Sequence, residues 1–263
     1  MRKLAILISG HIRNLDDIID NLYNNLIKII LSEFEYDIYI HTWDNNITYD
    51  KIANSDIYYE DIRINTEYIK KLFNNNNMVV KKIIIENQKQ IRNELELEKY
   101  MNNNTQNRSI HNNLDNNYVK SFIEKLFFQY YGHYKVLSSL DLDCKYNYII
   151  KTRPDMLYEK FDINLFKYDI FFPNSHQRGG NNINQLFFGG KTEYMINILK
   201  FFEKCIFYNK NMNFNIINKH DKTDINLNEL FRYYIINYLN YKPFFTNYNP
   251  KIYRNKEHII TII

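Results

Sequence analysis

The chain has 263 residues, 45% of them apolar and 24% charged, and its 34 Lys and Arg against 30 Asp and Glu give a formal net charge of +4. This size and composition indicate a single globular domain over 1–263 and exclude a collagen-like chain, a coiled coil and a wholly disordered chain. Two cysteines, Cys144 and Cys205, are too few for a disulfide framework or a cysteine-rich zinc site. The small charge excess gives little support to a nucleic-acid partner, and we expect none.

The N-terminus and the apolar runs bear on location. The chain begins Met-Arg-Lys followed by the apolar run 4–8, like a signal peptide, but it turns polar at Ser9 without a small-residue cleavage site. No apolar run approaches the ~20 residues of a transmembrane segment. We therefore expect a cytoplasmic protein, in the host cytoplasm if it is viral, with at most a peripheral membrane contact. The abundance of residues with AT-rich codons indicates an AT-rich bacterium or a large virus.

The first half of the chain alternates strands and helices. Residues 3–9 form a short apolar run that ends in Ser9-Gly10, which is typical of a buried strand followed by a turn. Apolar residues at helical spacing predict a helix over 15–34. Further strands are predicted over 36–41 and 78–85, and a helix over 88–100. This alternation predicts an α/β domain with a mainly parallel sheet.

The second half begins with an Asn-rich stretch over 101–117, which lacks periodicity and predicts a mobile loop. Its most evident strand covers 147–152 and ends in Arg153-Pro154-Asp155. The other predicted elements are helices over 118–140, 193–208 and 227–239, strands over 169–172 and 185–188, and one or two closing strands over 251–263. Five of the six glycines are expected at one rim of the sheet, namely Gly10, Gly179, Gly180, Gly189 and Gly190.

The common signatures of nucleotide-binding proteins and hydrolases are absent. The motifs G-x-x-x-x-G-K-[ST], G-x-G-x-x-G, G-x-S-x-G and H-E-x-x-H do not occur. Open α/β sheets bind their ligands beyond the carboxyl ends of the strands. Three predicted strand ends are therefore the candidate sites.

The first two strand ends offer groups for a nucleotide. After the first strand, Ser9 and Gly10 bring the backbone close to a ligand, and Arg13 can pair with phosphate. The alternative there is a tight turn with a surface arginine. After the second strand, Trp43 can stack on a base while Asp44 binds a ribose hydroxyl. The alternative there is a tryptophan that only packs.

The third strand end offers Arg153 and Asp155, with Pro154 ending the strand. A carboxylate in this position can ligate Mg²⁺ or Mn²⁺, with diphosphate oxygens and waters as the other ligands. Such an ion stabilises the charge on a departing nucleoside diphosphate. The alternative is a surface Arg–Asp pair that caps the strand.

Taken together, the three segments resemble a group of GT-A-fold glycosyltransferases found in bacterial surface-polysaccharide gene clusters and in large DNA viruses. They read KLAILISGHIRN over 3–14, YDIYIHTWD over 36–44 and YNYIIKTRPD over 146–155. The resemblance covers the first strand–helix–strand unit and roughly residues 122–190. It implies a GT-A-like, Rossmann-related, mainly parallel sheet flanked by helices. It also implies a nucleotide-sugar donor bound over the sheet and a glycan or lipid-linked acceptor.

The resemblance also implies roles for single residues. Asp155 takes the position of the acidic metal-binding motif, as a catalytic residue and as the ligand of Mn²⁺ or Mg²⁺. Arg153 replaces the first carboxylate of Asp-x-Asp and is expected to pair with the donor diphosphate. The segment INQLFFG over 183–189 makes Asn184, Gln185 and Gly189 acceptor-side or loop candidates. Asn184 stands where relatives often have Asp, and it cannot take up a proton.

Glu229, near the start of the last predicted helix, is then the candidate catalytic base. The alternative for Glu229 is a solvated residue that interacts with the helix dipole. Two other function classes stay open. One is a single-stranded nucleic-acid-binding module, suggested by 16% aromatic residues, although these lie on apolar helix stripes. The other is a nucleotidyltransferase-like enzyme, which needs a second carboxylate for two metals, with Asp162 as the near candidate.

Overall fold

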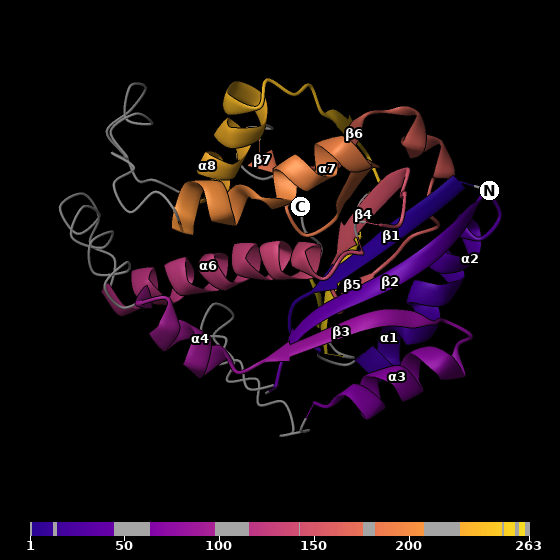
Figure 1. The fold of residues 1–263 in the computed structure, drawn as a ribbon, viewed down its shortest axis with the longest axis horizontal. Helices are drawn as coiled ribbons and strands as arrows, with labels where there is room; N and C mark the ends of the chain where they lie inside the picture. The colour runs from indigo at the N-terminus through magenta and orange to yellow at the C-terminus, as the bar shows by residue number, and fades with distance from the viewer. Residues whose placement is uncertain are drawn as a thin grey trace.

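The computed structural model is an α/β fold in which helices cover both faces of a mixed sheet (Figure 1). The structure describes residues 2–12, 15–44, 64–97, 116–141, 143–175, 182–207, 227–248, 250–255 and 258–260. Within these ranges the strand order is β3 (Val80–Glu86), β2 (Phe34–Trp43), β1 (Arg2–Ser9), β4 (Tyr148–Thr152), β8 (Phe188–Lys191), β6 (Ile170–Ser175) and β7 (Asn182–Ile183), and β9 (Phe244–Thr246) pairs with β6.

The strands β3, β2, β1 and β4 form the parallel half of the sheet. β1 pairs with β2 on one side and with β4 on the other, so that Ile8 lies opposite both Ile40 and Thr152. The chain moves outward from β1 through β2 to β3 and then returns to the other side of β1 for β4. Open α/β sheets bind ligands at such a reversal of strand order, beyond the carboxyl ends of the strands.

Beyond β4 the sheet is mixed, because β8 runs antiparallel to both β4 and β6. A second sheet contains β11 (His258–Ile260), β10 (Lys251–Asn255) and β5 (Met156–Leu157), and its last two strands in the chain confirm the predicted closing strands. The N–H of Tyr253 in β10 donates to the carbonyl oxygen of Asp155 at 2.8 Å. The C-terminal strands therefore support the turn that follows β4.

Alternate strand residues pack against two helical layers. In β1, Leu4, Ile6 and Ile8 belong to one apolar core, and Ala5 and Leu7 to the other. The first core, on the α1 face, is covered by α1 (Leu15–Leu22), a π-helical turn over Tyr23–Ile27, α2 (Lys28–Ile30), α3 (Thr66–Asn75) and a 3-10 helix over Ile163–Lys167. The second, on the α6 face, is covered by α4 (Gln88–Glu94), α6 (Asn116–Ser138), α7 (Thr192–Leu199) and α8 (Leu227–Tyr233), with π-helical turns over Phe202–Phe207 and Tyr234–Tyr238 (Figure 1).

The prediction of an α/β domain with a mainly parallel sheet is confirmed, with one correction. The strand expected over 185–188 is wrong, because β8 begins at Phe188 and places Gly189 and Gly190 inside the sheet. A Cβ on Gly189 would lie 2.5 Å from Cζ of Phe171, and one on Gly190 would lie 2.2 Å from the carbonyl oxygen of Asp169. Close packing between β6 and β8 therefore explains these glycines, and the expected position at a rim does not.

Two further differences concern the middle of the chain. The sequence analysis did not predict α3, which begins after Asn65, whose side chain accepts a hydrogen bond from the N–H of Tyr68 at 2.8 Å. Residues 101–115, most of the predicted Asn-rich loop, lie outside the described residues, while Asn116 and Asn117 belong to α6.

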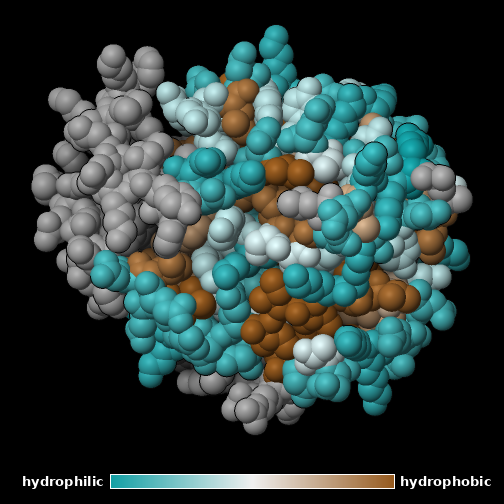
Figure 2. Space-filling model, viewed as in Figure 1, coloured by the Kyte–Doolittle hydropathy of each residue, from teal (hydrophilic) through white to brown (hydrophobic). Residues whose placement is uncertain are grey.

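The surface in Figure 2 shows an apolar area where Figure 1 places β3, the last strand of the sheet on that side. Val79, directly before β3, is 73% exposed, and Ile83, Ile84 and Ile85 are partly exposed. Among the helices of the described ranges, none is long and apolar enough to cross a membrane.

Candidate functional site

Three strand ends meet at the reversal of strand order. Ser9 at the end of β1 lies opposite His41 of β2, and the N–H of Gly10 donates to the carbonyl oxygen of His41 at 3.2 Å. Gly10 has a φ of +138°, which residues with a side chain rarely adopt. A Cβ at Gly10 would lie 3.4 Å from Cδ of Pro154, in the turn after β4. We call this region the strand-end site, and its residues are Ser9, Gly10, His41, Lys151, Arg153, Asp155, Gly132 and His133.

Arg153 and Asp155 form a two-pronged ion pair in this site. Nε of Arg153 donates to Oδ1 of Asp155 at 2.7 Å, and Nη2 donates to Oδ2 at 2.6 Å. The side chain of Asp155 is fully buried, and that of Arg153 is 16% exposed. Burial lowers the pKa of Arg153, but the neighbouring Asp155 more than reverses this, so that the pKa is raised. Arg153 is therefore a fixed positive charge at the outer edge of the site.

Lys151 lies beneath this pair, on the α6 face of β4. Its side chain is completely buried, and within the described part of the chain Nζ has no hydrogen-bond partner. Burial lowers the pKa of Lys151 strongly, and the charge of Arg153 lowers it further. Such an unpaired buried amine is unfavourable for folding, and polar groups of this kind are often found at functional sites.

His133 of α6 adds a second buried nitrogen to the same place. It is 2% exposed, and its Nε2 has no hydrogen-bond partner among the residues the structure describes. Burial lowers the pKa of His133 strongly, and the charges of Lys151 and Arg153 act in the same direction. The inner wall of the strand-end site therefore consists of nitrogen-bearing side chains that carry positive charge when protonated.

Helix α6 approaches the strand ends closely at Gly132. A Cβ on Gly132 would lie 3.4 Å from Nδ1 of His41 and 3.5 Å from Oγ of Ser9. The other ring nitrogen of His41 lies 2.8 Å from Oε2 of Glu86, at the end of β3. Burial lowers the pKa of His41, although Glu86 opposes this effect. Lys135 of α6 in turn lies 3.1 Å from Oε1 of Glu86 and helps to balance its charge.

Trp43 ends β2 beside this region, and Asp44 follows it directly. The Trp43 side chain is 2% exposed, and its ring stacks on Tyr131 with centroids 5.8 Å apart. This geometry favours the packing interpretation of Trp43 over base stacking. Asp44 differs, because Oδ2 accepts from Asn87 at 2.8 Å while Oδ1 is buried without a partner among the described residues. Asp44 thus keeps an acceptor available for a ligand hydroxyl.

The three predicted acceptor-side residues lie in different surroundings. Asn184 is buried, and its Oδ1 accepts from the N–H of Leu186 at 2.9 Å, while Nδ2 has no partner among the residues described. Gln185 donates from Nε2 to Oδ1 of Asn228 in α8 at 2.8 Å. The loop position of Gly189 is a correction, because Gly189 lies inside β8, where close packing requires a glycine, while its acceptor-side role stays a prediction.

Two predicted residues cannot be placed in the site. Arg13 lies outside the described residues. Glu229 belongs to α8, but its side chain lies outside the described part of the structure. The roles of Arg13 in donor binding and of Glu229 as a base therefore stay predictions.

The sequence analysis missed Lys151 and His133. A signal for Lys151 was present, because it follows Ile149 by two residues in a strand predicted to be buried, and side chains two apart share a face. His133 lies on the apolar stripe of a predicted helix, where an ordinary core histidine is the usual interpretation. Only the packing of α6 against the sheet, beside the strand ends, shows that the two side chains belong to one site.

The residues around Asp155 do not fit the predicted Mg²⁺ or Mn²⁺ ion. Both carboxylate oxygens accept hydrogen bonds from Arg153 and are buried, whereas a hard cation requires several oxygen ligands. Within the described ranges, no group of three or more His, Cys, Asp and Glu side chains is arranged to hold a metal. The arrangement therefore supports no step that passes through a metal.

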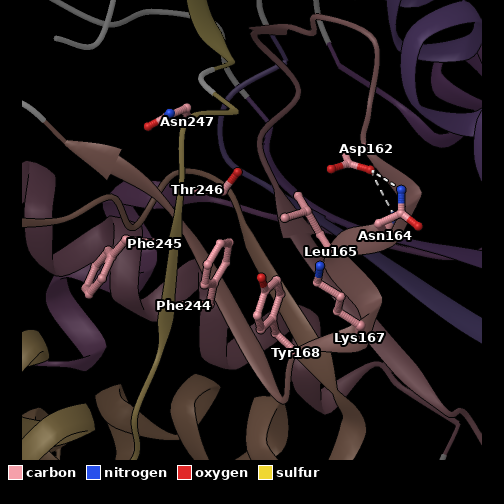
Figure 3. A pocket seen from close by; sticks show the side chains of 9 residues that line it. All are labelled: Asp162, Asn164, Leu165, Lys167, Tyr168, Phe244, Phe245, Thr246 and Asn247. Carbon is pink, nitrogen blue, oxygen red and sulfur yellow. Dashed lines mark hydrogen bonds between the residues drawn. The ribbon is translucent and has the colours of Figure 1, made fainter.

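A separate hollow of about 350 Å³ lies between the 3-10 helix and β9 (Figure 3). The rings of Tyr168 and Phe244 stack in it with centroids 3.6 Å apart. Asp162 caps the 3-10 helix by accepting from the N–H and the side-chain amide of Asn164, both at 3.0 Å. The hollow contains no residue of the strand-end site. Its lining residues are Asp162, Asn164, Leu165, Lys167, Tyr168, Phe244, Phe245, Thr246 and Asn247.

Comparison of the chain with protein-family models and with curated proteins found no match. The strand-end site is therefore interpreted from its own geometry and chemistry.

Proposed function

We propose that the protein is a glycosyltransferase that moves a sugar from a nucleotide-sugar donor to a glycan or lipid-linked acceptor. The observation that carries this proposal is the cluster of Lys151, Arg153 and His133 at the reversal of strand order. Nucleotides bind α/β sheets at this position, and their diphosphate groups require positive charge and hydrogen-bond donors. The same strand ends carry the resemblance to GT-A-fold enzymes, and the sheet is compatible with a Rossmann-like fold.

The donor is proposed to lie across the ends of β1, β2 and β4. Its diphosphate would face Arg153 and the backbone beside Gly10, which has no side chain to hinder the approach. The ribose would reach Asp44, whose Oδ1 accepts no hydrogen bond from the residues that the structure describes. Arg13, which lies outside the described residues, is also proposed to contact the diphosphate. The acceptor would then approach from the side of Asn184 and Gln185.

The chemistry required of these residues is mainly electrostatic. As the bond between sugar and diphosphate breaks, negative charge grows on the leaving oxygen. Positive groups already held in place stabilise this charge without rearrangement during the reaction. Arg153 is held by Asp155 in this way. The acceptor hydroxyl must also lose a proton, and Glu229 remains the proposed base.

The nucleic-acid-binding alternative finds less support in the packing. Phe127, Phe128, Tyr130, Phe201 and Phe202 are all at most 5% exposed, so they cannot stack on bases. They pack on one another and on the α6 face of the sheet. This is the core-packing role that their positions on helix stripes predicted.

Thermal denaturation with a panel of nucleoside diphosphates, followed by assay of sugar transfer, tests the proposal. A nucleotide at a hundredfold excess over its Kd stabilises the folded protein by about 2.7 kcal/mol. At this chain length we expect Tm to rise by about 5–10 °C. Arg153→Gln should abolish the rise, whereas Arg2→Gln, which changes an arginine with a 51% exposed side chain, should preserve it. No rise with any nucleotide, or a rise that survives in Arg153→Gln, would contradict the proposal.

A further inference from the structure

Asp155 is the one carboxylate among the described residues of the strand-end site, and it makes no hydrogen bond with Nζ of Lys151. Asp155 is already engaged at both oxygens by Arg153. Strand β4 itself carries no carboxylate. The negative charge of Asp155 acts on Lys151, but the positive charge of Arg153 opposes it. The other titratable groups that act on Lys151 or are affected by it are His133 of α6 and His41 of β2, neither of which is an anion. Among the described residues of the strand-end site, Lys151 therefore has no anionic partner of its own, and the anionic group of a ligand could take that place.

The position of Lys151 allows its ammonium group to bind the anionic group of a ligand. Lys151 lies in β4 and Arg153 follows the end of that strand directly, and the charges of both act on His133 of α6. Arg153 forms the partly exposed outer layer and Lys151 the buried inner layer. A lysine side chain is long and flexible, and its ammonium group is a compact charge with three donors. It can therefore turn toward an anion that enters beside Arg153.

We propose that the strand-end site binds the diphosphate of its nucleotide without a divalent ion, and that Lys151 together with Arg153 supplies the charge that a metal would otherwise provide. The inference rests on the proposed function. It names the groups that recognise the diphosphate and assigns Lys151 a binding role. It also gives the Arg153–Asp155 pair a new meaning, since Asp155 orients the guanidinium and is not a metal ligand.

Isothermal titration calorimetry with nucleoside diphosphates and with inorganic pyrophosphate tests this inference, in EDTA and in Mg²⁺ or Mn²⁺. We expect at least one nucleotide to bind with the same Kd, within about twofold, under all these conditions. Lys151→Met should weaken binding at least tenfold in EDTA. The matched control is Lys82→Met, which changes an exposed strand lysine and should leave Kd within twofold of the parent. Circular dichroism establishes that both variants are folded.

A second variant keeps the test decisive. Asp155→Asn removes the negative charge but preserves the shape, so it leaves Arg153 with more unbalanced charge. The inference predicts that pyrophosphate still binds this variant in EDTA, with no metal present. A metal-binding role for Asp155 predicts the opposite, namely binding that requires metal in the parent and is lost in the variant.

The outcomes separate this inference from the proposed function. Binding that requires Mg²⁺ or Mn²⁺, or an unchanged Kd in Lys151→Met, overturns the inference and leaves a nucleotide-binding enzyme in place. Absence of binding by every nucleotide and by pyrophosphate, with and without metal, overturns both.

Discussion

Lys151→Met should make the protein more stable while it weakens ligand binding. The lysine amine is fully buried without a hydrogen-bond partner among the described residues, and such an unpaired polar group costs about 1–3 kcal/mol. Methionine fills a similar volume without a polar atom and adapts to irregular packing. The free energy of unfolding should therefore rise by about 2 kcal/mol, which corresponds to about 4–8 °C in Tm.

The pH dependence of this gain provides the assay. The pKa of Lys151 is lowered in the folded protein, so the unfolded chain binds more protons and the stability of the parent rises with pH. The advantage of Lys151→Met should shrink as pH rises toward about 10.4, where the unfolded lysine also loses its proton. Urea denaturation at several pH values between 7 and 10 measures this difference. A variant less stable than the parent, or an advantage that does not change with pH, would refute the reasoning.

Three other substitutions test particular parts of the structure. Gly189→Ala should lower the free energy of unfolding by about 1–3 kcal/mol, measured with urea, because the new methyl group meets the ring of Phe171; an unchanged midpoint would contradict the close packing. Asp44→Ala should weaken a nucleoside diphosphate about tenfold in calorimetry but leave pyrophosphate binding unchanged, and equal loss for both would remove the ribose role. Burial raises the pKa of Asp37, but hydrogen bonds, chiefly from Tyr146, outweigh it and leave the pKa lowered, so Asp37 stabilises the fold at neutral pH and this contribution disappears as pH falls through its folded pKa. Asp37→Asn should then lose stability at pH 7 and lose progressively less as pH falls, as thermal denaturation at several pH values between 7 and 2 will show.

Much of the parallel half of the sheet could be predicted from the sequence. The strands over 3–9 and 36–41 are apolar runs with a helix pattern between them, and both are found as β1 and β2. Parallel pairing then brings their carboxyl ends together with that of β4. The motifs could therefore be placed at one edge before any contact was known.

The antiparallel part was harder to predict, for a physical reason. Gly189 and Gly190 look like the end of a strand because glycine has little preference for extended structure. In β8 they are selected by the closeness of β6, which no local pattern encodes. The short strands β7 and β9 are likewise defined by their partners and not by their own sequence.

The site shows the same limit at the level of single side chains. Local sequence identifies Arg153 and Asp155 as polar residues at a strand end, but it leaves open whether the carboxylate faces a ligand or its own arginine. The structure gives the second arrangement, with two hydrogen bonds between the side chains. An arginine held in this way needs no rearrangement to bind a diphosphate. A carboxylate whose two oxygens are both bonded to an arginine is no longer available to bind a metal. Under the proposed function, Arg153 and the buried Lys151 are therefore understood together, as the two groups that balance the charge of the diphosphate.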